Sequence, residues 1–184
     1  MIGVLVSGSG TNLQALIDAG LPVAAVASNK SGVRALARAE SAGIATRVFP
    51  LEDYAGREER DRAMAEWLDE RRVELVVCAG YMHLLTPPFL ERFPGRIINV
   101  HPSLLPAFPG AHAVDDALAA GVRETGTTVH VVDEGLDSGP ILMQERVSVL
   151  DDDTRETLHA RIQAVEHRLL PQAARMMLER ETVA

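Results

Sequence analysis

The sequence predicts an α/β fold, a doubly wound and mostly parallel sheet with an antiparallel hairpin at its C-terminal edge. Two observations support this prediction. Up to residue 100, short apolar segments alternate with helical segments, as they do where right-handed helical crossovers join parallel strands. Beyond residue 125, two strand-like segments are separated only by "GLDS", and such a short connection makes an antiparallel pair.

The parallel part of the fold is predicted element by element. Five short apolar segments are expected to be buried strands: 2–6, 22–28, 45–49, 73–80 and 96–100. Four segments between them are predicted to be helices: 11–20, 32–43, 57–72 and 86–92. Gly20 and Gly43 end the first two helices, because glycine readily adopts the left-handed conformation of a helix terminus. The third helix is amphipathic, with an expected inner face of Ala63, Met64, Trp67 and Leu68.

The C-terminal part follows a different pattern. Strands are predicted at 126–134 and 139–149, followed by a long helix over 154–179. Pro171 lies within that helix and is expected to kink or split it, because proline lacks a backbone donor and clashes with the preceding turn. The sequence contains no internal repeat or linker, so a single domain over residues 1–184 is predicted.

Composition excludes several classes of protein. The net charge is −8, from 18 basic and 26 acidic residues, and no basic cluster indicates a nucleic-acid partner. No run of 18 apolar residues indicates a membrane span, and "MIGVLVSGSG" lacks the basic segment of a signal peptide. We therefore expect a cytoplasmic protein. Its one cysteine, Cys78, lies in an apolar strand and is expected to pack in the core.

A glycine-rich stretch, "SGSGTN" at 7–12, joins the first strand to the first helix. Glycines let backbone N–H groups approach a ligand, and a helix N-terminus favours an anion, so Gly10, Thr11 and Asn12 form a candidate phosphate site. The alternative is a plain glycine turn in which Thr11 caps the helix. Leu13 stands where a dinucleotide loop needs a small residue, so a nicotinamide site is not expected.

The stretch "NVHPSLLPAFPGAH", residues 99–112, places an Asn and a His before a proline-rich loop. Residues i and i+2 of a strand point to the same side, so Asn99 and His101 can both face a cleft at the end of the fifth strand. An amide beside an imidazole suits stabilisation of an oxyanion on a carbonyl carbon. The alternative is that His101 only satisfies a backbone group at a turn.

Asp137 lies between glycines in the hairpin connection, where it can orient His101 or move protons. An aspartate that only bonds to its own turn is the alternative. No metal is expected, because the six histidines lack metal-binding spacing, although His101 and His112 flank the proline-rich loop.

Together these stretches closely resemble the phosphoribosylglycinamide formyltransferase family, folate-dependent enzymes of purine synthesis. The resemblance extends over residues 2–175 and includes, in order, "SGSGTNLQALID", "SNK", "AGYM", "NVHPSLLPAFPGAH", "GTTVHVVDEGLDSGPIL" and "VEHRLLP". It implies a Rossmann-like formyltransferase fold. The sequence departs from the family's pattern at His83 and Ala107, where members often carry a basic residue.

The resemblance implies a role for individual residues. Asn99, His101 and Asp137 match the family's catalytic trio. The family's ribotide-binding residues, for the phosphate and the ribose hydroxyls, correspond to Gly10, Thr11, Asn12 and Glu166. Its folate-binding residues correspond to Arg57 (at the glutamate tail), Met82, His83, Leu84, Leu85 and Asn99, together with the backbone of residues 133–137.

The implied reaction moves a formyl group from 10-formyltetrahydrofolate, a co-substrate, to the amine of glycinamide ribonucleotide, in a monomer or homodimer without a metal. A formyltetrahydrofolate hydrolase is the nearest alternative, and it usually carries a further domain before the first strand. Methionyl-tRNA formyltransferase shares the trio but typically has a tRNA-binding domain. A non-catalytic module that binds nucleotide phosphates would need only the glycine-rich loop.

Overall fold

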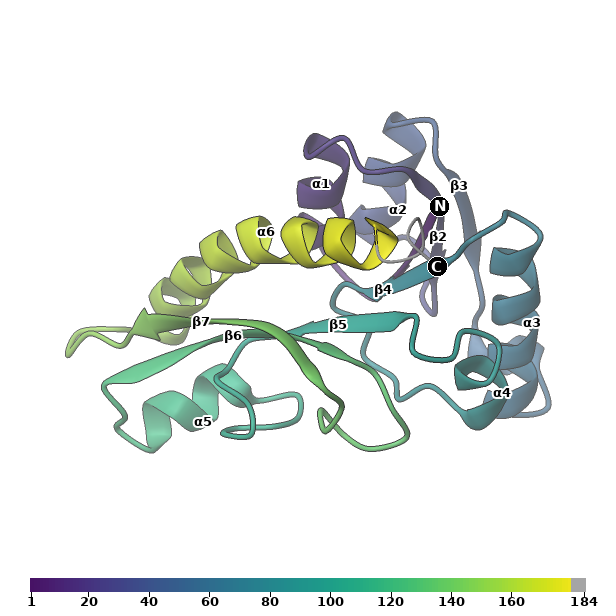
Figure 1. Cartoon of the computed structure of the whole chain (residues 1–184). Helices are drawn as coiled ribbons and strands as arrows, with labels where there is room; N and C mark the ends of the chain where they lie inside the picture. The colour runs from purple at the N-terminus through teal and green to yellow at the C-terminus, as the bar shows by residue number, and fades with distance from the viewer. Residues whose placement is uncertain (180–184) are drawn as a thin grey trace.

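The structure is a computed structural model that describes residues 1–179. Its centre is a seven-stranded sheet in the order β3-β2-β1-β4-β5-β6-β7 (Figure 1). β1 to β5 pair in parallel, whereas β6 and β7 are antiparallel to their neighbours. The strands are Ile2–Val6 (β1), Val23–Ser28 (β2), Ala45–Val48 (β3), Leu75–Cys78 (β4), Ile97–His101 (β5), Glu124–Val131 (β6) and Ile141–Ser148 (β7).

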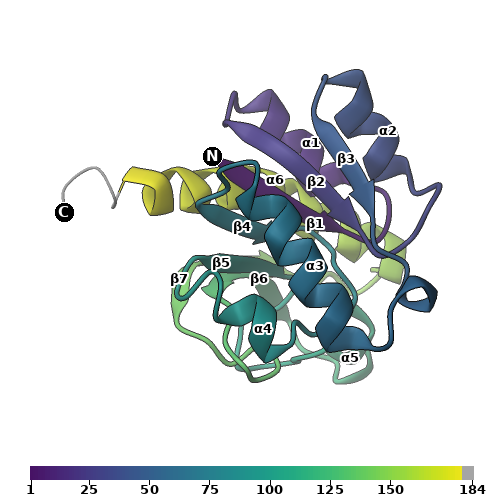
Figure 2. The same cartoon turned by 90° about the vertical axis from the view of Figure 1, so that its right-hand side faces the viewer.

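Helices cover both faces of this sheet. One apolar core joins the sheet to α1, α2 and α6, and a second joins the other face to α3 and α4, which lie in front of it in Figure 2. α5 packs its Val114 against β7 and α6 in a third, smaller cluster. The helices are Thr11–Asp18 (α1), Arg34–Ser41 (α2), Arg57–Asp69 (α3), Pro87–Leu90 (α4), Ala113–Ala119 (α5) and Arg155–Glu179 (α6), with a 3₁₀ turn at Leu51–Asp53 (η1).

The central strand β1 shows how the sequence produces this layering. All five of its residues are buried, and alternate residues belong to opposite cores: Val4 packs with α1 and α6, and Leu5 packs with α3. A Cβ on Gly3 would lie 2.9 Å from the Leu68 side chain, so glycine is what lets α3 pack this closely. Burial on both faces explains why β1 is apolar without alternation.

The predicted fold class is confirmed, including the antiparallel hairpin, but a split of the last helix is wrong and two short elements were not predicted. α6 is not split at Pro171, because it continues as one helix to Glu179. Pro171 is buried beside Leu170 and Ala174 in the core, and that packing offsets the hydrogen bond that proline cannot make. The short helix α5 and the turn η1 were not predicted.

The sheet order determines where a site can form. The chain turns back at β1, which has β2 on one side and β4 on the other, so the carboxyl ends of β1, β4 and β5 are neighbours. Ligands of such sheets bind at this change of direction. The stretches "SGSGTN", "AGYM" and "HPS", which the sequence analysis singled out, lie at the carboxyl ends of β1, β4 and β5. Among residues 1–179, no helix is both long and apolar enough to cross a membrane.

Candidate active site

A cavity of about 480 Å³ opens at the carboxyl ends of these strands. Its walls come from segments far apart in the sequence: residues 7–12, 78–85, 99–102, 110–115 and 132–137, together with His130 and four residues of α6. Every predicted site residue except Arg57 lines this cavity. The glycine-rich loop, the Asn–His pair and the hairpin aspartate therefore share one site.

Asn99 and His101 point to the same side of β5, as the i, i+2 spacing predicted. Their neighbours Ile98 and Val100 pack into the core on the opposite face. Asn99 is half-buried, and His101 is only 4% exposed. Both side chains are therefore shielded from bulk water while they border the cavity, which strengthens any hydrogen bond they donate.

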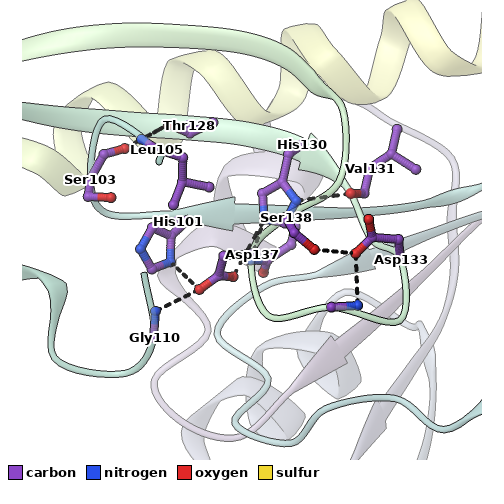
Figure 3. A network of polar contacts seen from close by, with 12 residues as sticks. His101, Ser103, Leu105, Gly110, Thr128, His130, Val131, Asp133, Asp137 and Ser138 are labelled. Atoms are coloured by element: carbon purple, nitrogen blue, oxygen red, sulfur yellow. Dashed lines mark hydrogen bonds and ion pairs between the residues drawn. The ribbon is translucent and has the colours of Figure 1, made fainter. Parts of the chain in front are cut away.

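Asp137 lies between two histidines at the hairpin tip (Figure 3). One carboxylate oxygen is 3.4 Å from Nδ1 of His101 and accepts a 2.7 Å hydrogen bond from the backbone N–H of Gly110. The other oxygen is 3.6 Å from Nε2 of His130. Asp137 has a left-handed backbone, with φ of 51°, which is uncommon for a residue other than glycine and occurs often at functional sites.

The surroundings of Asp137 keep it ionised. Burial alone would raise the pKa of its carboxyl group. The nearby imidazole of His130, the hydrogen bond from Gly110 and the charge of His101 together outweigh burial and hold the pKa of Asp137 below its usual range. Asp137 is therefore a carboxylate at neutral pH, able to orient His101 and to accept a proton.

The hydrogen bonds of His101 define its orientation. Its Nε2 lies 2.8 Å from the carbonyl oxygen of Phe108, and a carbonyl only accepts, so Nε2 carries a proton. Nδ1 is the nitrogen that faces Asp137. The proline-rich loop thus holds the Nε2 edge of the ring, and the hairpin approaches the Nδ1 edge. The orientation of the His101 ring is therefore fixed.

His130 is a site residue that the sequence reasoning missed. It lies opposite Asn99 in the antiparallel pairing of β5 with β6. Nδ1 of His130 donates to the carbonyl oxygen of Val131 at 3.0 Å, and its Nε2 lies 3.2 Å from the amide nitrogen of Asn99 and 3.6 Å from a carboxylate oxygen of Asp137. His130 therefore lies against both Asn99 and Asp137. The alternation of "TTVHVV" indicated a strand, but the register that brings this histidine to Asn99 is not readable from the sequence.

The glycine-rich loop starts α1 without a side-chain cap in the described structure. Gly10 is the N-cap residue, with φ of 72°, and a Cβ there would lie 2.6 Å from that of Ala35. The alternative in which Thr11 caps the helix is therefore wrong, since Thr11 is already the first helical residue. The first-turn N–H groups remain beside the cavity, as an anion site requires.

Asn12 connects the glycine-rich loop to α6. Its Nδ2 donates to Glu166 at 2.9 Å, and its Oδ1 is buried without a hydrogen-bond partner in the described part of the chain. Glu166 is 4% exposed, and burial raises the pKa of its carboxyl group, while the bond from Asn12 opposes that rise. A buried carboxylate and an unpaired amide oxygen at one wall are acceptors for hydroxyl groups of a ligand.

The end of the cavity formed by residues 82–85 and 136 is more apolar. Met82, Leu84 and Leu136 line it and are 58%, 52% and 53% exposed, unusually high for large apolar side chains. Leu85 lines the same end and is half-buried. Such a patch suits a flat aromatic ligand. Arg57 lies outside the lining and donates to the carbonyl oxygen of Leu84, so its role at a folate tail stays a prediction.

Two other predicted features can be placed in the structure. Cys78 is buried in β4 within the second core, where burial raises the pKa of its thiol to about 12, so it remains protonated. The described residues contain no cluster of three or more His, Cys, Asp or Glu side chains that could hold a metal ion. His112 borders the cavity without joining such a cluster.

Comparison with known proteins gives a consistent result. Residues 1–174 match the family model described as formyl transferase. A phosphoribosylglycinamide formyltransferase from Mycobacterium tuberculosis is 48% identical over 172 residues, which cover 91% of this chain and 80% of that protein. The crystal structure of glycinamide ribonucleotide transformylase 1 from Symbiobacterium toebii superimposes with a TM-score of 0.95 at 48% identity, covering 97% of this chain and 87% of that one.

A larger protein also contains a similar segment. The trifunctional purine biosynthetic protein adenosine-3 of Gallus gallus is 47% identical over 182 residues, which are 96% of this chain. The chain spans only 18% of that relative's length.

Proposed function

Since this chain belongs to the formyl transferase family, we propose that it transfers the formyl group of 10-formyltetrahydrofolate to the amine of glycinamide ribonucleotide. The products are formylglycinamide ribonucleotide and tetrahydrofolate, as in a phosphoribosylglycinamide formyltransferase of purine synthesis. We propose that residues 1–184 act as one formyltransferase domain. The relatives that carry this name support the choice of substrates.

One observation carries the proposal: Asn99, His101 and Asp137 line one cavity, and the other parts of its wall differ in chemistry. The end beside the glycine-rich loop offers helix N–H groups and a buried carboxylate, which suit a phosphate and ribose hydroxyls. The end beside Met82 and Leu84 offers apolar surface, which suits a pterin ring. Two substrates bound in this way bring the amine of one and the formyl carbon of the other together beside Asn99, His101 and Asp137.

The ribotide is held by groups of the first helix and the last. Gly10, Thr11 and Asn12 receive the phosphate at the amino terminus of α1, where backbone N–H groups and the helix dipole favour an anion. Glu166 and the amide oxygen of Asn12 accept hydrogen bonds from the ribose hydroxyls. This placement leaves the glycinamide amine directed toward β5.

The folate lies along residues 82–85 and the hairpin loop 133–137. Met82, Leu84 and Leu85 contact the pterin, and backbone groups of the loop hydrogen-bond to its edge. Arg57 meets the glutamate tail, which requires its side chain to leave the carbonyl oxygen of Leu84. Asn99 contacts the formyl oxygen, so the same amide binds the donor and stabilises the reacting centre.

The reaction proceeds by addition and elimination. The amine nitrogen forms a bond to the formyl carbon, and the electron pair of the C=O double bond moves to oxygen. Asn99 donates a hydrogen bond to the oxyanion, and so does the protonated Nδ1 of His101, since Nε2 is held by the carbonyl oxygen of Phe108. Each donor aimed in advance contributes about 3–4 kcal/mol of barrier reduction. The bond from carbon to N10 of the folate then breaks as the carbonyl re-forms. Because donors held by the folded chain need no reorganisation, their effect is larger than in water.

Protons must move during these steps, and Asp137 is the group placed to move them. The attacking nitrogen gives up a proton to the Asp137 carboxylate, directly or through a water molecule, and N10 gains a proton as it leaves. Asp137 also holds His101 in the orientation that faces the oxyanion. Positioned acid–base groups of this kind contribute about 10²–10⁴-fold in rate.

The test is a pair of reactions with purified protein and 10-formyltetrahydrofolate, one with glycinamide ribonucleotide and one without it. We expect tetrahydrofolate to form only when the ribotide is present. Formation at the same rate in both reactions would indicate hydrolysis to formate and would overturn the transferase assignment. No tetrahydrofolate in either reaction would leave a binding function without catalysis.

A further inference from the structure

A fully buried ion pair lies behind the folate end of the cavity. Arg60 and Asp61 are neighbours on α3, and both side chains are 0% exposed. Nη2 and Nε of Arg60 donate to one oxygen of Asp61 at 2.6 Å and 2.9 Å. Removing two charges from water is costly, and a buried pair is often no more stabilising than apolar residues of the same size. Stability alone therefore does not explain why this ion pair is buried.

The pair holds both ends of a short segment of the cavity wall. Nη1 of Arg60 contacts Nδ1 of His83 at 2.7 Å. The second oxygen of Asp61 accepts from the backbone N–H and the hydroxyl of Thr86, at 2.9 Å and 2.8 Å. Thr86 is the N-cap of α4, so Asp61 also fixes where the segment ends and the helix begins.

The same segment is tied to the ribotide side of the cavity. The backbone N–H of Met82 donates to the hydroxyl of Ser7 at 3.0 Å, and Ser7 pairs with the side-chain amide of Asn29 at 2.6 Å. That amide lies 3.3 Å from Nε2 of His83. A closed circuit thus joins His83 to the glycine-rich loop through the "SNK" stretch after β2.

The contact with Arg60 determines which nitrogen of His83 carries the proton. A guanidinium has donors and no acceptor, so Nδ1 of His83 must be unprotonated to bond with Arg60. The ring is then neutral and its proton is on Nε2, so the side-chain amide of Asn29, 3.3 Å away, must turn its oxygen toward that proton and its NH₂ group toward Ser7. Protonating Nδ1 would replace a hydrogen bond by two cations 2.7 Å apart. Burial, with the charges of Arg60 and Arg57, lowers the pKa of His83 in agreement with this geometry.

We propose that Arg60, fixed by Asp61, is a positioning residue that holds neutral His83 and with it the wall segment Met82–Thr86 of the folate pocket. The inference rests on the proposed function, since it assigns a role toward the formyl donor. Arg60 touches no substrate; it acts through His83, whose ring and whose neighbours Met82 and Leu84 border the cavity. His83 stands where family members often carry arginine, so here a cation from α3 supports a histidine at that position.

The charged groups around His83 predict how this wall responds to acid. Arg57 and Arg60 face the ring from α3, and Lys30 approaches from the loop after β2. Burial and these three cations lower the pKa of His83, and the acidic Asp61 opposes them. Three cations against one anion disfavour a charged ring. Protonation of His83 at low pH therefore breaks the contact with Arg60 and loosens the wall, so donor binding weakens as the pH falls below the usual histidine range.

The geometry can be tested without any assay of activity. Protein labelled with ¹⁵N at histidine distinguishes ring nitrogens with and without a proton by their chemical shifts. We expect His83, identified by its loss from the His83→Gln spectrum, to show an unprotonated Nδ1 and a protonated Nε2 at pH 7.5. A protonated Nδ1 would overturn the assigned hydrogen bond from Arg60, and with it the proposal.

The functional test compares two variants at His83, because truncating Arg60 would leave Asp61 buried and unpaired. His83→Phe keeps a ring beside Tyr81 but offers no acceptor, whereas His83→Gln offers an amide oxygen to Arg60. We expect His83→Phe to raise the KM for 10-formyltetrahydrofolate about ten- to hundredfold, the range for loss of one hydrogen bond to a charged group. The ribotide KM and kcat should change less than about twofold, too little to indicate a lost interaction with the transition state.

His83→Gln supplies the rescue and the pH readout. We expect it to recover most of the donor affinity lost in His83→Phe, and to lack the rise in donor KM that is expected for the native chain as the pH falls below the usual histidine range. Arg62→Ala, an exposed arginine on the same helix, is the matched control for altering charge on α3. Equal donor KM values for His83→Phe and the native chain, or the same acid rise in His83→Gln, would overturn the positioning role.

Failure of the inference can be told apart from failure of the proposed function. If the native chain transfers no formyl group, the proposed function fails, and binding of tetrahydrofolate measured by calorimetry replaces the KM as the readout for the variants. If the native chain transfers formyl and His83→Phe keeps its donor KM, only the inference fails.

Discussion

Replacing Asp137 by asparagine removes one negative charge and keeps the size of the side chain. The carboxylate lies 3.4 Å from Nδ1 of His101. At an effective dielectric constant of about 20, opposite unit charges at that distance attract by about 5 kcal/mol, an upper bound for what the neutral amide forfeits. Since about 1.4 kcal/mol corresponds to a tenfold change, we expect kcat to fall by about 10²–10⁴-fold.

The ribotide should bind to Asp137→Asn almost as well as to the native chain, because its phosphate and ribose groups are proposed to lie at Gly10–Asn12 and Glu166. Steady-state measurement of kcat and of the ribotide KM separates these effects. Asp133→Asn is the matched control: Asp133 belongs to the same loop, but its oxygen accepts from Gly135 and Ser138 instead of facing His101. Its kcat should fall far less. Equal losses in kcat and ribotide affinity for Asp137→Asn would mean that Asp137 only shapes the turn.

Three further substitutions test other parts of the site. His101→Ala should abolish most turnover while circular dichroism shows an intact fold; a near-normal kcat would refute the mechanism. Glu166→Gln should raise the ribotide KM, yet stabilise the protein at pH 7, because the raised pKa of Glu166 makes its charged form costly. That gain should shrink as the pH falls through the raised pKa toward 4.5, the ordinary pKa of glutamate, and a gain at pH 3 as large as at pH 7 would contradict it. Gly10→Ala should lower the free energy of unfolding by about 1–3 kcal/mol, through positive φ and contact with Ala35; unchanged urea unfolding would contradict this.

The sequence predicted the parallel sheet because its buried strands are apolar and its helices are ended by glycines. It also placed Asn99 and His101 on one side of β5, since alternation along a strand is purely local. His130 was missed because its meeting with Asn99 depends on the register of β5 against β6, which are separated by the 22 residues 102–123. Register is a property of the folded sheet.

The buried pair on α3 was missed for a different reason. Arg60 lies four residues before Met64 and eight before Leu68, the spacing of one helix face, so periodicity places it inside. A search for apolar residues passes over it, because a charged side chain is normally exposed. Only the positions of Asp61 and His83 in three dimensions explain how that charge is accommodated.

The most direct test of the central claim follows the formyl carbon itself. Protein is incubated with 10-formyltetrahydrofolate labelled with ¹³C in the formyl group and with glycinamide ribonucleotide, and the products are observed by NMR. Transfer predicts that the label moves to an amide carbon on the ribotide at the rate at which tetrahydrofolate forms. Label recovered as free formate would contradict the account.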